Sequence, residues 1–148
     1  MDILVDTGVL LRLVISADPL NAEVRRAIKV LRARGDRLIT LTQNTSEFWN
    51  VCTRPPASRG GYGFSVEETA RKLKLIERLV SVRADSDTVY EEWKRLLIAH
   101  DVKGVKVHDT RIVAAMKVYG MSSLLTFNGE DFKRFAKIIT VVAPKNVI

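Results

Sequence analysis

The chain opens on a short apolar run that ends in an acid, Ile3-Leu4-Val5-Asp6, and continues as Thr7-Gly8-Val9-Leu10-Leu11. The apolar run predicts a buried strand, and apolar residues at helical spacing up to Ile15 predict a helix directly after it. Further apolar runs at 38–41, 123–126 and 137–142 predict three more strands. Strands separated by helices indicate an α/β fold, with a mostly parallel central sheet and helices on both faces.

The segments between these strands carry helical patterns with recognisable ends. We expect helices from Asp18-Pro19 to Gly35, through Glu47 and Cys52, from Ser65 to Leu79, over 86–99, and from Asp109 onward. The interval 53–63 holds Pro55-Pro56 and three glycines and is predicted to be a basic loop. Its aromatic residues could stack on RNA bases, but packing on the core is the favoured interpretation.

Composition places the chain among single-domain proteins with a full-sized core. Its 148 residues are 47% hydrophobic, so we expect one domain over 1–148. The lone cysteine, Cys52, excludes an internal disulfide, is expected to fill core space, and favours the reducing cytoplasm. No leader segment or membrane span is expected, because the N-terminus is acidic and Arg12 interrupts the longest early apolar stretch.

Acidic residues stand at the edges of several of these apolar elements. Asp6 ends the first strand, Asn128 and Asp131 follow the strand at 123–126, and Glu47 and Asp109 lie at or in helices. In a parallel sheet, ligands bind outside the carboxyl ends of the strands, so two of these segments point to one rim. Two carboxylates about 4 Å apart repel by roughly 4 kcal/mol at an effective dielectric near 20. Convergence would therefore call for a divalent cation such as Mg²⁺ or Mn²⁺.

Each acid also has an ordinary structural interpretation. Asp6 and Asp109 could cap helices, Glu47 could lie at a rim with its carboxylate in water, and Asp131 could be a solvated first-turn acid. The net charge of +7 suits an enzyme that attracts a polyanion, but it also suits any soluble basic protein. Single residues therefore do not decide the function.

In order and spacing, however, five short motifs resemble the PIN-domain ribonucleases, specifically the VapC-type toxins of bacterial toxin–antitoxin pairs. The matching segments are Asp6 to Leu11, Ser46 to Val51, Thr53-Arg54-Pro55, His108 to Ala115, and Leu125 to Asn128 with Asp131-Phe132. The resemblance extends from Met1 to about Val142 and implies a PIN-like three-layer fold. A haloacid-dehalogenase-like phosphatase fits less well, because Gly8 stands where its second aspartate belongs.

By this resemblance, Asp6, Glu47 and Asp109 are the expected metal-binding and catalytic acids. The family's fourth acid is replaced here by Asn128, which offers a neutral oxygen, and Asp131 could supply the missing carboxylate directly or through water. Thr126 matches a small hydroxyl residue that often lines the site. Thr7 is expected to contact the metal-binding acids without binding the metal itself.

The resemblance implies a Mg²⁺- or Mn²⁺-dependent endoribonuclease that acts as a toxin in the cytoplasm. Its expected partners are an RNA substrate, a small cognate antitoxin and a second copy in a homodimer, with no membrane. Two alternatives stay open: a housekeeping RNA-processing nuclease, and a non-catalytic PIN module that binds RNA or protein.

Overall fold

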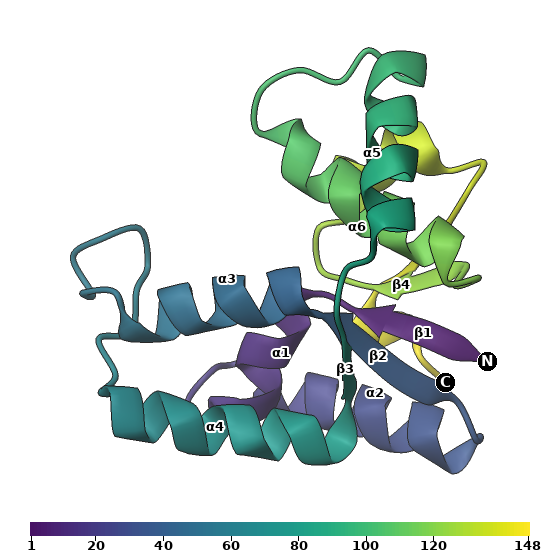
Figure 1. Ribbon diagram of the computed structural model, residues 1–148. Coiled ribbons are helices and arrows are strands. Elements are labelled where there is room, and N and C mark those ends of the chain that lie inside the picture. The colour runs from purple at the N-terminus through teal and green to yellow at the C-terminus, as the bar shows by residue number, and fades with distance from the viewer.

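A computed structural model describes residues 1–148 as an α/β fold built on one five-stranded sheet (Figure 1). All strand pairs are parallel, and the spatial order is β3-β2-β1-β4-β5. The strands are β1 (Asp2–Val5), β2 (Arg37–Leu41), β3 (Ser81–Arg83), β4 (Ser123–Leu125) and β5 (Thr140–Val142). The three-layer architecture expected from the sequence is therefore confirmed.

Four helices cover one face of the sheet. They are α1 (Thr7–Val14), α2 (Asn21–Ala33), α3 (Thr42–Thr53) and α4 (Val66–Leu79), and they pack with the short 3-10 helix η2 (Pro144–Asn146). Strand residues such as Ile3, Val5 and Leu38 point into this layer, where Phe48 and Cys52 are fully buried. Cys52 is thus core filler as expected, and burial raises the pKa of its thiol to about 11.

The opposite face is covered by α5 (Asp87–Ala99), α6 (Lys106–Val118) and the 3-10 helix η1 (Gly129–Phe135). Figure 1 shows α5 and α6 above the sheet, and α1, α2 and α4 below it. The alternate strand residues Leu4, Ile39 and Leu124 face this second core. The period of two along each strand therefore divides the apolar residues between two cores, as buried parallel strands require.

The order of the strands fixes where a ligand site is expected. From β1 the chain builds β2 and β3 on one side, and then crosses to build β4 and β5 on the other. The topological switch point therefore lies between β1 and β4, and open α/β sheets bind ligands outside the carboxyl ends of the strands at this point. Asp6 directly follows β1, and Thr126 directly follows β4.

Several boundaries differ from the sequence prediction. Strand β3 was not predicted, because it is three residues long and all three residues are exposed, so it has no run of buried apolar side chains. Helix α2 begins at Asn21 and not at Asp18, whose side chain instead accepts a hydrogen bond from the Leu20 backbone N–H at 2.8 Å. Strand β5 begins at Thr140 and not at Lys137, because η1 occupies the chain up to Phe135.

The basic loop between α3 and α4 follows the favoured interpretation of its aromatic residues. Tyr62 and Phe64 stack on each other with ring centroids 5.3 Å apart, and both pack against the first core. Their backbone N–H groups donate to the carbonyls of Val51 and Cys52. None of the helices combines the length and apolar character needed to cross a membrane.

Candidate functional site

Asp6 lies at the switch point and is almost completely buried, with 7% of its surface exposed. Its Oδ1 accepts the Thr7 backbone N–H at 2.8 Å, and its Oδ2 accepts the Thr126 hydroxyl at 2.6 Å. The residue caps α1, so the capping interpretation is correct, but a cap alone does not explain such deep burial of a carboxylate. The second strand end, through Thr126, fixes the direction in which Asp6 points.

Glu47 comes from α3 and is held beside Asp6 through Thr7. The Thr7 hydroxyl donates to Glu47 Oε2 at 2.7 Å, and the Gln43 side-chain amide donates to Glu47 Oε1 at 3.2 Å. Gln43 stands one helical turn before Glu47, so the same helix both presents the acid and orients it. The expected supporting role of Thr7 therefore has a direct geometric basis.

Asp109 and Asp131 complete the acidic rim from α6 and η1. Lys106 lies between them, with its Nζ 2.7 Å from Asp131 Oδ1 and 3.9 Å from Asp109 Oδ2. Asp109 is not a helix cap, which corrects that interpretation, because α6 begins at Lys106 with Val105 at the capping position. The helix starts three residues earlier than the sequence suggested, and so the acid lies within its first turn.

The four acids lie in one electrostatic field, as the pKa shifts show. Burial, helped by the nearby charges of Asp131, Asp6 and Glu47, raises the pKa of Asp109 to about 6, while Lys106 opposes the shift. Burial also raises the pKa of Asp6, against the hydrogen bonds from Thr126 and Thr7, and Glu47 and Asp131 raise it further. Carboxylates from four separate segments therefore lie close enough for their charges to affect one another.

Two of the residues that hold these acids were missed from the sequence. Asn44 is fully buried, and its side-chain amide donates to Asp6 Oδ1 at 3.3 Å and to the Thr7 hydroxyl at 3.1 Å. Gln43 joins α3 to α6, because it also donates to the His108 carbonyl at 3.0 Å. The only sequence signal for them is their spacing of three and four residues before Glu47.

Asn128 is placed differently from the four acids. Its side chain is exposed and makes no hydrogen bond to any of them, while its backbone N–H donates to the Thr126 hydroxyl at 3.0 Å. Thr126 is thereby held on one side by Asn128 and donates on the other side to Asp6. In this structure Asn128 supports the rim through its backbone.

The donor chemistry of the rim fits a hard divalent cation. Its ligands would all be carboxylate or amide oxygens, which Mg²⁺ and Mn²⁺ prefer, and one lysine offsets only part of the charge of four acids. As the side chains stand, no three His, Cys, Asp or Glu residues form a group that could hold a metal ion. The rim therefore fits a divalent cation in the type and charge of its donors. For the cation to bind, Lys106 would have to give up its ion pairs with Asp109 and Asp131.

Comparison with family models gives a match over most of the chain. The family model described as the PIN domain matches residues 3–138. The chain belongs to the PIN-domain family. No curated protein matches the sequence at a significant level.

Solved structures share the fold at low sequence identity. VapBC2 from Rickettsia felis, bound to a promoter DNA fragment, aligns with a TM-score of 0.73 and 14% identity, over 97% of this chain and 98% of that one. VapBC-1 from nontypeable Haemophilus influenzae gives 0.67 and 16%, over 99% and 100%. VapC20 from Mycobacterium tuberculosis, described as a sarcin-ricin loop cleaving toxin, gives 0.62 and 19%, over 88% and 93%. At such identities the likeness establishes the fold.

The raised pKa of Asp109 predicts how the stability of the metal-free protein depends on pH. The folded state favours the neutral Asp109 carboxyl over the charged one. The contribution of this protonated carboxyl to the free energy of unfolding is therefore complete below about pH 4 and is lost as the pH rises through 6. In EDTA, the free energy of unfolding of Asp109→Asn, relative to that of the wild type, should therefore rise by about 1 kcal/mol between pH 4 and pH 7.5. This figure is reduced because the Asp109 side chain is 29% exposed to solvent.

Urea unfolding at each pH measures this difference. Asp101→Asn is the matched control, because Asp101 is 86% exposed and pairs only with Lys103. A difference between Asp109→Asn and the wild type that stays constant from pH 4 to 7.5 would contradict the crowded-acid account of this residue.

Proposed function

We propose that this PIN domain is a metal-dependent endoribonuclease and the toxin of a type II toxin–antitoxin pair. The observation that carries the proposal is that Asp6 lies at the switch point of the sheet and that the nearby charges of Glu47 and Asp131 help to raise the pKa values of both Asp6 and Asp109. Similarity in fold to toxin–antitoxin complexes, and to a toxin described as cleaving the sarcin-ricin loop, supports this reading.

The four acids would hold one or two Mg²⁺ or Mn²⁺ ions, with Asn128 as a further neutral oxygen ligand. When bound, such an ion activates a water molecule and neutralises charge on the scissile phosphate. Asp131 would join the ligands only when Lys106 releases it, since Lys106 Nζ stands 2.7 Å from its Oδ1. The lysine ammonium is then available, close to the rim, to attract a phosphate.

The other groups of the site prepare the acids for this task. Thr126 and Asn44 orient Asp6, and Thr7 and Gln43 orient Glu47. With a pKa of about 6, the Asp109 carboxyl carries a proton in mild acid and loses it toward neutral pH. Cleavage should therefore require a pH above this value, where all ligands are charged. The net charge of +7 favours the approach of RNA.

The direct test is RNA cleavage by single-residue variants. Asp6→Asn or Asp109→Asn should lower Mg²⁺- or Mn²⁺-dependent cleavage more than a hundredfold, because the ion supplies several kcal/mol of transition-state stabilisation. Neither variant should reduce metal-free stability by more than the roughly 1 kcal/mol of a lost cap. The control Asp101→Asn, on an exposed turn, should cleave as the wild type does.

For this test, the protein is expressed with and without the protein encoded by the neighbouring gene, and the ends of the cleaved RNA are mapped. These ends should carry 5′-phosphates. If Asp6→Asn cleaves RNA as fast as the wild type does, Asp6 is not part of the catalytic site. Cleavage without toxicity, and without an effect of the neighbour, would favour a housekeeping nuclease. If no RNA is cleaved with any divalent metal, the non-catalytic PIN module that binds RNA or protein is the remaining alternative.

A groove on the first helical layer supports the proposal of a protein partner. Its volume is about 720 Å³, and it runs between α1, α2 and α4. Five aliphatic and five basic side chains line it: Leu13, Val14, Ile28, Leu75 and Leu79, with Arg25, Arg26, Lys29, Arg32 and Arg78. A lining of aliphatic and basic side chains complements an acidic amphipathic segment, which is the chemistry we propose for the antitoxin.

Charge reversal on the groove tests this partner. Arg25 and Lys29 are exposed, lie one turn apart on α2 and line the groove. The double variant Arg25→Glu/Lys29→Glu should bind the small protein encoded by the adjacent reading frame about tenfold or more weakly, mainly through slower association. Cleavage by the free toxin should stay unchanged, since neither residue touches the acidic rim.

Titration calorimetry or surface plasmon resonance at several salt concentrations measures the effect. The matched control is Lys103→Glu/Lys137→Glu, which makes the same charge change at exposed positions away from the groove. Equal weakening by both double variants would mean that overall charge, and not the groove, governs the association.

A further inference from the structure

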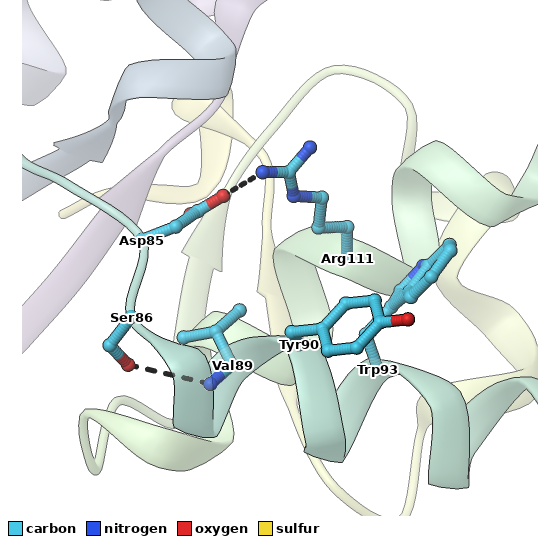
Figure 2. A pocket seen from close by; sticks show the side chains of 6 residues that line it. All are labelled: Asp85, Ser86, Val89, Tyr90, Trp93 and Arg111. Atoms are coloured by element: carbon cyan, nitrogen blue, oxygen red, sulfur yellow. Dashed lines mark hydrogen bonds and ion pairs between the residues drawn. The ribbon is translucent and has the colours of Figure 1, made fainter.

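A small cavity lies beside the acidic rim and includes none of its four acids. It has a volume of about 260 Å³ and is lined by six residues, Asp85, Ser86, Val89, Tyr90, Trp93 and Arg111 (Figure 2). This is slightly below the roughly 300–1,000 Å³ of sites for whole small molecules. The cavity therefore suits a single planar ring and not a folded segment of a partner.

The topology places this cavity on the same edge of the sheet as the acids. Asp85 follows β3, and β3 pairs in parallel with β2, which in turn pairs with β1. Two strand spacings of about 4.8 Å separate the end of β3 from the end of β1, or roughly 10 Å. Arg111 stands two residues after Asp109 on α6, so this helix contributes one residue to the cavity and one to the acidic rim.

The walls of the cavity are fixed before any ligand binds. Arg111 pairs with Asp85, as Figure 2 shows, and Ser86 caps the first turn of α5. Behind Asp85, the Tyr119 hydroxyl donates to the Ala84 carbonyl at 2.6 Å. The Trp93 indole N–H donates to the Val107 carbonyl at 2.8 Å, which ties α5 to the first turn of α6. A preformed cavity binds at a lower entropic cost than one that must first be ordered.

The chemistry of the lining fits a nucleobase. Tyr90 is 55% exposed, its ring lies 6.0 Å from that of Trp93, and Lys94 Nζ lies 4.8 Å from the Tyr90 ring centroid, so a partly exposed aromatic ring stands near two cations, Lys94 and Arg111. Bases stack on aromatic faces and on arginine planes. Asp85 Oδ1 has no hydrogen-bond partner, so an occupant that donates an N–H, as bases do, would satisfy it.

We propose that this cavity binds one unpaired base of the RNA substrate, on the edge of the sheet that also carries the acids. The proposal rests on the ribonuclease function proposed above and adds a subsite that holds the strand in register with them. Asp87 and Glu91 lie near Tyr90 on α5 and offset the positive charges of Lys94, which pairs with Glu91, and of Arg111, so we expect the binding to come from stacking.

The test measures RNA affinity without cleavage. A ten-nucleotide oligouridylate with a 5′-fluorescein label is titrated with protein in EDTA and followed by fluorescence anisotropy at several salt concentrations. Tyr90→Ala should bind at least fivefold more weakly, the lower bound for one base–aromatic stack. The slope of log affinity against log salt should stay unchanged, because no phosphate contact is lost.

Two control variants separate stacking from other effects. Tyr90→Phe keeps the aromatic face, and Ile98→Ala removes an 83% exposed side chain from the far end of the same helix. Both should bind within twofold of the wild type. In the same complex, 4-thiouridine within the oligonucleotide should form photo-crosslinks to Tyr90 or Trp93.

Unchanged affinity of Tyr90→Ala, a changed salt slope, or no measurable binding by the wild type would each overturn the subsite. Its failure is distinguishable from failure of the ribonuclease proposal. If the wild type cleaves RNA and Tyr90→Ala binds and cleaves equally well, only the subsite is wrong. If the wild type neither binds nor cleaves RNA, both are wrong.

Discussion

Mutual repulsion among four carboxylates is the constraint on which the site depends. The sheet brings Asp6 to the switch point, and three other segments bring Glu47, Asp109 and Asp131 into its field. Buried like charges are unstable unless donors or cations offset them. Hydroxyl and amide donors and one lysine take this role, and they also set the direction of each acid: Thr7, Gln43, Asn44, Lys106 and Thr126.

The sequence predicted those parts of the fold and site that follow from local patterns. Apolar runs revealed four of the five strands, and the acids at their ends were expected at one rim because parallel strands share a carboxyl edge. The parts that were missed depend on tertiary contacts. Strand β3 carries no apolar side chain facing a core, Asn44 and Gln43 resemble ordinary helix residues, and the position of Lys106 depends on where α6 begins.

Three surfaces with different chemistry surround this framework. The acidic rim suits cations and phosphate, the basic groove over α1, α2 and α4 suits an acidic amphipathic segment, and the aromatic cavity beside α6 suits a base. The groove belongs to the first helical layer and the cavity to the second, on opposite faces of the sheet. Inhibition by a partner and contact with RNA are therefore separable by mutation.

Metal binding to the folded protein tests the central claim most directly. Thermal unfolding is measured in EDTA and with Mg²⁺, Mn²⁺ or Ca²⁺, for the wild type and for Asp109→Asn. A cation held only by the folded acids stabilises the wild type by about 2.7 kcal/mol at a hundredfold excess over its Kd, and Asp109→Asn by much less. An unfolding temperature of the wild type that none of the three ions changes would contradict the account, because the gathered carboxylates would then have no cation to hold.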